Sequence, residues 1–229
     1  ARNELPMISS DSGVFARAKK NWEGLAAGEP LDSILTGFEN DGRALQRFYE
    51  SGENSIAQLM QRLESLDVDL ENNRALDFGC GIGRLTSALS VRFNQTWGLD
   101  ISETMIEIAM ATASTPDCKY AVLNEPGLNS FESNYFDFAI SLLVLQHIEP
   151  AHGPMYVAEL LRVLKPGGVL VLQVPDAPNW GPLGMRLRLM RALPGYLKRV
   201  VRTVLRRPEH ILMHGIKETA VLKIAAASG

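Results

Sequence analysis

A turn with three glycines at alternating positions most constrains the fold of this chain. In the segment RALDFGCGIGRL at 74–85, a short apolar run passes through Gly79, Gly81 and Gly83 and continues with apolar residues at helical spacing. Glycine has no Cβ, so it adopts positive φ readily and lets a ligand lie against the backbone. The helix that follows directs its unpaired N–H groups into the same turn. The pattern therefore predicts a strand, a tight turn that holds a ligand, and a helix.

The spacing of these glycines differs from that of a dinucleotide fingerprint. That fingerprint is G-x-G-x-x-G and seats a pyrophosphate on the helix N-terminus. Here the pattern is G-x-G-x-G, and Asp77 stands two positions before the first glycine. A carboxylate at this position repels a pyrophosphate but suits an ammonium or sulfonium group. The alternative is a strand-to-helix turn without a ligand, so the flanking sequence has to decide.

A second acid ends the next predicted strand. The segment QTWGLDIS at 95–102 places Asp100 at the strand end and Ser102 where it caps the following helix. Asp100 comes 17 residues after Gly83, which is where a second-strand carboxylate accepts hydrogen bonds from both hydroxyls of a ribose. The alternative is an acid that is favoured at a helix start by the macrodipole. Two acids around one glycine turn favour the ligand site.

Alternating strands and helices predict the fold class. Further strands are expected at 118–123, 136–142 and 169–174, with a helix at 151–164 and a tight turn in KPGG at 165–168. This alternation is typical of an α/β protein with a doubly wound, mostly parallel sheet. Ligands of such sheets bind beyond the carboxyl ends of the strands, where the acids and glycines fall.

Helices are also expected before the first strand. Apolar residues at helical spacing predict one helix from 12 to about 28, a second region from 43 that is interrupted at Ser51 and Gly52, and a third helix at 55–66. These helices either cover an edge of the sheet or lie over the glycine turn. Periodicity alone does not separate the two alternatives.

Composition places the chain among globular proteins. It has 229 residues, of which 46% are hydrophobic and 21% charged, and a net charge of −3 that gives no reason to expect nucleic acid. Cys80 and Cys118 form no disulfide framework, which favours a reduced, cytoplasmic protein. Neither a membrane span nor a signal peptide is evident. The histidines and cysteines lack metal-ligand spacing, so we expect no metal.

The segment 181–207 reverses the charge of the chain. It holds eight basic residues and no acid, whereas the other 202 residues carry 15 basic and 26 acidic ones. Beyond Pro194 its apolar residues recur at near-helical spacing, which predicts a basic amphipathic helix. Three interpretations stay open: a lid for an acidic or lipid-like substrate, peripheral contact with an anionic membrane, or a helical insertion with a solvated basic face.

Four segments in order resemble the motifs of the class I S-adenosylmethionine-dependent methyltransferases. They cover about 74–175 and read LDFGCGIGRL, GLDIS, FDFAISLLVLQHI and LLRVLKPGGVLVLQVP. The resemblance implies a Rossmann-like methyltransferase fold with strand order 3-2-1-4-5. It implies S-adenosylmethionine as cofactor, S-adenosylhomocysteine as product and a small-molecule methyl acceptor. Such proteins add two more strands, which would follow Gly229, so we expect that the ends of the chain are incomplete.

The resemblance also implies roles for single residues. Asp77 would approach the methionine ammonium, Asp100 would hold the ribose hydroxyls, and Ile101 would pack on the adenine. Asn124 or Glu125 stands where an acid often contacts the adenine amino group. The remaining cofactor-binding positions that it implies are Gly79, Cys80 (through its backbone), Gly81, Gly83, Ser141 and Leu142.

His147 is the candidate for a catalytic base. It follows the fourth predicted strand, and an imidazole titrates near neutrality. A hydroxyl acceptor needs such a base, whereas an amine or enolate does not. The alternative is that Gln146 and His147 fix their loop by hydrogen bonds. His210 and His214 follow the basic segment and are weaker candidates.

These observations predict one methyltransferase domain over 1–229. Its expected parts are a helical cap at 1–70, a cofactor-binding core at 71–175, a basic helical insertion or lid at 176–214, and a last helix at 215–229. The predicted reaction is methyl transfer to O, N or C of an acidic, sugar-linked or lipid-linked small molecule. Two other functions stay open, namely a non-catalytic cofactor- or partner-binding module of the same fold and a nicotinamide-dependent oxidoreductase.

Overall fold

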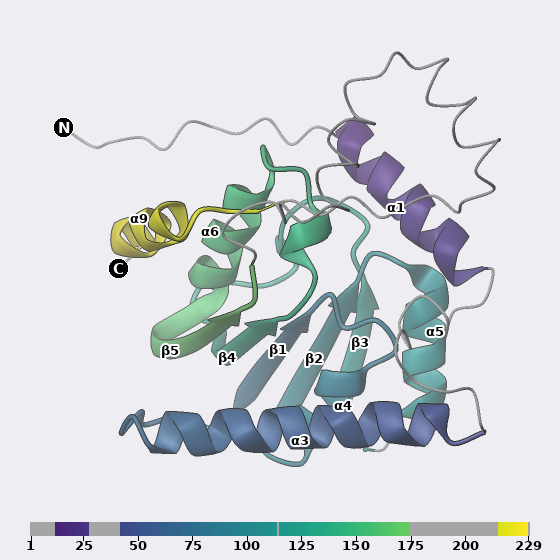
Figure 1. Cartoon of the computed structure of the whole chain (residues 1–229). Helices are drawn as coiled ribbons and strands as arrows, with labels where there is room; N and C mark the ends of the chain where they lie inside the picture. The colour runs from purple at the N-terminus through teal and green to yellow at the C-terminus, as the bar shows by residue number, and fades with distance from the viewer. Residues whose placement is uncertain (1–11, 28–41, 114, 175–214, 229) are drawn as a thin grey trace, which may run out of the picture.

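The computed structural model describes residues 12–27, 42–113, 115–174 and 215–228. Figure 1 draws them as coloured ribbons. The predicted basic helix at 181–207, His210, His214 and the expected cap residue Gly229 lie outside the described residues.

A five-stranded parallel sheet forms the centre of the fold (Figure 1). Along the sheet the order is β3-β2-β1-β4-β5, which confirms the predicted order. The chain therefore moves outward from β1 in one direction, returns, and continues from β4 in the other. The carboxyl ends of β1 and β4 thus meet at the switch point, where α/β sheets bind ligands. The strands are β1 (Arg74–Phe78), β2 (Gln95–Asp100), β3 (Cys118–Val122), β4 (Phe136–Ser141) and β5 (Leu164–Leu172).

Helices cover both faces of the sheet, which confirms the doubly wound architecture. On one face α3 (Ala44–Glu64) and α4 (Arg84–Ser90) bury a cluster against β1 and β4, and α5 (Glu103–Thr112) packs beside β3. On the other face α6 (Gly153–Val163) and α9 (Glu218–Ser228) share a second cluster with the same strands. Neighbouring residues of β1 point to opposite clusters, since strand side chains alternate.

The predicted break at Ser51 and Gly52 is wrong, because α3 runs through both residues without interruption. Gly52 is buried in the middle of α3, and a Cβ there would lie 2.4 Å from the backbone oxygen of Arg84. The glycine lets α3 approach α4 closely. This tertiary contact outweighs the helix propensity that glycine lacks.

The KPGG segment also differs from the prediction. We expected a turn followed by a strand from Val169, but β5 already begins at Leu164 and carries the turn as an irregularity. The register with β4 jumps from Phe136 opposite Leu164 to Phe138 opposite Val169. Lys165 pairs there with the buried carboxylate of Asp137. This ion pair explains the early pairing, since it fixes the segment at the amino end of the sheet.

Candidate functional site

The glycine turn lies at the carboxyl end of β1 and has the conformation that its sequence predicts. Gly79, Gly81 and Gly83 have φ of +79°, +54° and +87°. A Cβ on Gly79 would lie 2.2 Å from a methyl carbon of Val144, and one on Gly83 would lie 2.4 Å from the Tyr120 hydroxyl. Close packing and positive φ therefore both require glycine at these two positions.

Asp100 braces the turn from the end of β2. One carboxylate oxygen accepts the Gly81 N–H at 2.9 Å, and the other accepts the Ser102 N–H at 2.9 Å. Burial raises the pKa of Asp100, and the two backbone donors oppose that shift. Each carboxylate oxygen has a second lone pair, so the group can still accept hydrogen bonds from a ligand. The bond to Gly81 was not predicted from the sequence.

Asp77 is buried beneath the first turn of α4. Its carboxylate accepts the Thr86 hydroxyl at 2.7 Å, and both side chains are almost fully enclosed. Burial raises the pKa of Asp77 to about 6, although the Thr86 hydroxyl and the Arg84 charge lower it. The contact of Thr86 with Asp77 was not predicted from the sequence. The available signal was a hydroxyl residue between Leu85 and Ala88, within the apolar pattern of a short helix.

The segments after β3 and β4 bring the other predicted residues to the same edge. The Leu123 N–H donates to the Asp100 carbonyl at 2.7 Å, which sets Asn124 beside the end of β2. Ser141 is fully buried at the end of β4, and its hydroxyl has no hydrogen-bond partner among the described residues. A buried hydroxyl without a partner is uncommon and fits a ligand group at this edge.

Three further residues that were predicted to bind the cofactor differ in their surroundings. The Cys80 side chain packs with α5 and Tyr120, so only its backbone lines the turn, as predicted. Leu142 packs against the α3–α4 cluster. Ile101 is half-buried directly after β2.

His147 ends a short 3-10 helix, η1 (Leu145–His147), beyond β4. The Gln146 side-chain nitrogen lies 3.1 Å from His147 Nε2. An amide nitrogen only donates, so Nε2 accepts this bond. On another side, the Trp22 ring lies 5.3 Å from the imidazole ring at an interplanar angle of 71°. The side chain is therefore held by two neighbours, one of which comes from the N-terminal helix.

That helix, α1 (Ser12–Ala26), lies on the side to which the strand arrows point (Figure 1). Lys19 donates to Asn124 at 2.7 Å, Trp22 contacts His147, and the Glu23 carboxylate accepts the backbone N–H groups of residues 103 and 104. The two N-terminal helices thus differ in position. α3 covers a face of the sheet and not the expected edge, whereas α1 lies over the strand ends.

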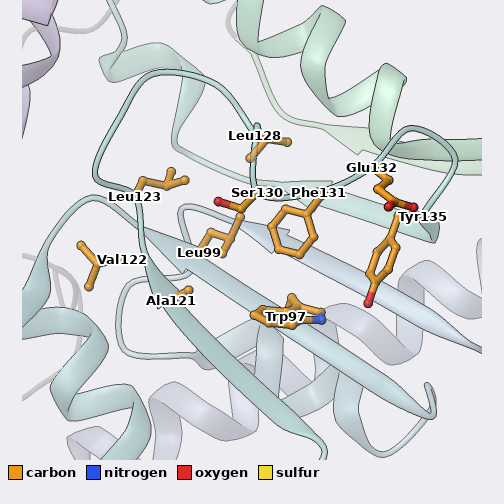
Figure 2. Close-up of a pocket in the computed structure, with 10 residues that line it drawn as sticks. All are labelled: Trp97, Leu99, Ala121, Val122, Leu123, Leu128, Ser130, Phe131, Glu132 and Tyr135. Carbon is orange, nitrogen blue, oxygen red and sulfur yellow. The ribbon is translucent and has the colours of Figure 1, made fainter.

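A separate cavity of about 380 Å³ lies on the sheet face opposite α5 (Figure 2). None of the predicted site residues lines it. Its outer wall is the loop between β3 and β4, which Arg162 holds through the carbonyls of Leu128 and Phe131 at 3.0 Å each. Trp97 and Phe131 contact edge to face across it. The lining residues are Trp97, Leu99, Ala121, Val122, Leu123, Leu128, Ser130, Phe131, Glu132 and Tyr135.

Comparison with known proteins agrees with this geometry. Residues 76–172 match the family model described as a methyltransferase domain. Residues 76–172 are thus similar to methyltransferase domains, and the strand order of the sheet is that of the Rossmann-like methyltransferase fold. The matched residues begin in β1 and end at the last residue of β5, so they include every strand of the sheet.

Curated relatives support the same family. The 2-methyl-6-phytyl-1,4-hydroquinone methyltransferase of Synechocystis is 33% identical over 169 residues, which are 72% of this chain and 51% of the relative. A probable thiol methyltransferase of Arabidopsis thaliana is 34% identical over 117 residues, 49% of this chain and 52% of the relative. The chain spans about half the length of these two relatives, and a smaller share of a bifunctional biotin biosynthesis protein of Cellvibrio japonicus, at 21%.

Solved structures support the fold. The magnesium protoporphyrin IX methyltransferase of Synechocystis, solved with bound S-adenosylhomocysteine, has a TM-score of 0.63 and 20% identity. The alignment covers 93% of this chain and 89% of that one. At this identity the likeness concerns the fold.

No helix in 12–27, 42–113, 115–174 or 215–228 is long and apolar enough to cross a membrane. In the same ranges no group of three or more His, Cys, Asp or Glu side chains is placed to hold a metal ion.

Proposed function

We propose that this chain is a methyltransferase that uses S-adenosylmethionine to methylate a small molecule. The observation that carries the proposal is the pair of carboxylates around the glycine turn. The Asp100 carboxylate accepts the Gly81 N–H of the turn and keeps lone pairs for hydroxyl donors. Asp77 is buried near the end of β1, just before the turn begins. Negative charge on both sides disfavours a pyrophosphate and favours an adenosine that carries a cation. The family match over residues 76–172 supports this assignment.

The residues present fit S-adenosylmethionine. The glycine turn has positive φ at all three glycines, and the Ser141 hydroxyl lacks a partner among the described residues. In this proposal Asp100 accepts the ribose hydroxyls, Asp77 attracts the methionine ammonium, and Ile101 packs on the adenine. When bound, the cofactor supplies an electrophilic methyl group. The other residues that we assign to the cofactor are Gly79, Cys80, Gly81, Gly83, Asn124, Glu125, Ser141 and Leu142.

His147 is proposed as the base for an acceptor that must lose a proton. Its Nε2 accepts the Gln146 amide, so the neutral ring carries its proton on Nδ1. Exchange of the Gln146 bond for a bond to an acceptor hydroxyl would let Nε2 take up the acceptor's proton. For an acceptor that needs no base, Gln146 and His147 would act by fixing the loop, and most of the rate would come from orientation of the reactants.

The proposal extends to the methyl acceptor and to the cellular location of the protein. The two relatives named above act on a hydroquinone and, by their names, on thiols, so the family match does not choose an acceptor. The basic segment 181–207 favours an acidic or lipid-linked acceptor, or contact with an anionic membrane. We propose a cytoplasmic protein, with the division into 1–70, 71–175, 176–214 and 215–229 that the sequence predicts.

Calorimetry tests the cofactor assignment. The expected result is heat with S-adenosylhomocysteine and none with NAD. Asp100→Asn should weaken binding of S-adenosylhomocysteine at least tenfold, because one ribose acceptor is lost. Glu107→Gln, an exposed acid on α5, is the control and should bind like the wild type. Heat with NAD alone would overturn the proposal in favour of an oxidoreductase.

Turnover separates an enzyme from a binding module. The measurement is release of S-adenosylhomocysteine from S-adenosylmethionine in the presence of thiols, hydroquinones and organic acids. His147→Ala should lower the rate with a hydroxyl acceptor, whereas His152→Ala, which is on the α6 side of the loop, should not. Binding without release with any acceptor would favour the non-catalytic module. Sedimentation with anionic and neutral liposomes tests the membrane contact.

A further inference from the structure

One face of α1 contacts the segments that follow three different strands. Lys19, Trp22 and Glu23 are three and four residues apart, so they lie on the same side of the helix. Lys19 contacts Asn124 after β3, Trp22 contacts His147 after β4, and Glu23 contacts the start of α5 after β2. These segments contain the residues assigned above to the adenine, the base and the ribose. We call Lys19, Trp22 and Glu23 the contact face of α1.

Glu23 connects this face to the ribose acceptor. Its carboxylate accepts the N–H groups of Glu103 at 3.0 Å and Thr104 at 3.1 Å, together with the Thr104 hydroxyl at 2.5 Å. These donors belong to the first turn of α5, which has no partner for them within the helix. The next residue back, Ser102, donates its N–H to Asp100. A shift of α1 is therefore transmitted to Asp100 through two consecutive sets of backbone contacts.

Trp22 connects the same face to His147. The imidazole contacts both the Trp22 ring and the Gln146 amide. The 3-10 helix that carries it is short, and the Leu143 backbone just before it has φ of +64°. A branched residue other than glycine is strained there, so the local backbone does not by itself favour this loop conformation. The aromatic contact from α1 adds to the orientation that Gln146 gives the imidazole.

We propose that Trp22 is the positioning residue for His147, and that the contact face of α1 couples occupancy of the cofactor site to the orientation of this imidazole. The inference rests on the proposed function, since it takes Asp100 as a ribose acceptor and His147 as the base. Cofactor bound at Asp100 fixes the first turn of α5, α5 fixes Glu23, and α1 then holds Trp22 against His147. The base is thus oriented when the methyl donor is present.

Nuclear magnetic resonance of histidine ring protons tests the proposal without an acceptor. His147 is assigned with His147→Gln, and spectra are recorded with and without S-adenosylhomocysteine. The Trp22 ring current should shift the His147 signal in the wild type. Trp22→Leu should remove this shift, and Trp22→Phe should retain part of it. Asn21→Ala, an exposed neighbour on α1, is the control and should leave the His147 signal unchanged.

The coupling has its own measurement in the same spectra. S-adenosylhomocysteine should move the His147 signal in the wild type, and Glu23→Ala should reduce that movement at least threefold at saturating ligand. An unchanged His147 response in both Trp22→Leu and Glu23→Ala overturns the proposal. Absence of any S-adenosylhomocysteine binding overturns the proposed function instead, whereas the ring-current result without ligand still tests the contact of Trp22 with His147. Thermal unfolding confirms that each variant is folded.

Discussion

The two N-terminal helices, α1 and α3, make different contacts, although both have apolar residues at helical spacing. In α3 the buried residues recur every fourth position, at Ala44, Phe48, Gly52, Ile56 and Met60, and they pack over α4 and the sheet. In α1 only Ala26 is fully buried among the residues whose burial is described. Its contacts with the segments after the strands are made by a lysine, a tryptophan and a glutamate. Therefore α1 mainly contacts the segments that follow the strands, whereas α3 mainly packs in the core.

The comparison shows what separates a core helix from a site helix. Both helices have an apolar stripe, and α1 in addition places Lys19 and Glu23 against backbone donors and polar side chains at the strand ends. A core cannot accept such groups without partners. The difference can be measured, because changes in α3 should alter stability and changes in α1 should alter the site.

Ile56→Ala should give the largest change in stability. The side chain is 1% exposed between α3, α4 and the sheet. Its truncation should lower the free energy of unfolding by about 2–5 kcal/mol, through lost burial and the cavity that remains. Phe15→Ala on α1, where the ring is half-buried, is the matched change and should cost less than half as much. Urea unfolding measures both, and equal losses would contradict the comparison.

Asp77→Asn tests the buried acid beneath α4. The folded pKa of Asp77 is raised to about 6, above the unfolded value, so the folded protein binds the proton more tightly. Stability therefore falls as the pH rises from about 4 to about 6. A rise of about two pKa units amounts to about 3 kcal/mol.

The variant lacks this titration. It should match the wild type near pH 4 and be more stable at pH 7, by up to about 3 kcal/mol, while binding S-adenosylhomocysteine more weakly. Urea unfolding at several pH values, with Asp117→Asn on the surface as control, measures the difference. If the stability of Asp77→Asn and that of the wild type changed with pH in parallel, the pH dependence of stability would not come from Asp77.

Two glycines allow the same substitution in both helices. Gly52→Ala in α3 sets a Cβ at 2.4 Å from the Arg84 backbone oxygen and should cost about 1–3 kcal/mol by overpacking. Gly24→Ala in α1 meets no atom within 4 Å and should stabilise the protein by about 0.5–1 kcal/mol, because alanine favours a helix. Thermal unfolding should therefore show opposite signs. A gain in stability for Gly52→Ala would mean that α3 and α4 can move apart at no cost.

These glycines also show how far the sequence could lead. Gly79, Gly81 and Gly83 were predicted correctly, because a turn between a strand and a helix is a local feature. Gly52 was misread as a helix break, because its reason lies in Arg84, more than thirty residues away. The strand order was predictable, since alternating strands and helices and the position of the acids at strand ends allow few topologies.

The arrangement of the site was predictable only in part. Asp77 and Asp100 lie at the carboxyl ends of β1 and β2, where the sequence pattern predicted them, but their partners Thr86 and Gly81 were not foreseen. The contact of Trp22 with His147 joins residues far apart in the chain, and periodicity states only that a helix has an inward face. Which segment that face meets follows from tertiary packing.

Glu23→Gln should give the smallest change in stability. The contribution of Glu23 to stability should depend on pH in the opposite direction to that of Asp77. The Thr104 hydroxyl and the backbone donors of α5 lower the pKa of Glu23, and partial desolvation opposes this. The stabilisation is therefore complete above the unfolded pKa and is lost as the pH falls through the lowered folded value. Because the carboxylate acts as a helix cap that is only half-buried, we expect about 0.5–1 kcal/mol at pH 7.

The pH dependence distinguishes this cap from a packing effect. The deficit of Glu23→Gln should shrink at acid pH, as the pH falls through the lowered pKa of Glu23 and the wild-type carboxylate takes up its proton. It should also shrink in high salt, which screens charges that are in contact with solvent. Glu53→Gln, an exposed acid on α3, should show neither change. A deficit that stayed constant with pH and salt would mean that α1 is held by side-chain shape, and the charged contact that sets it apart from α3 would then contribute nothing measurable.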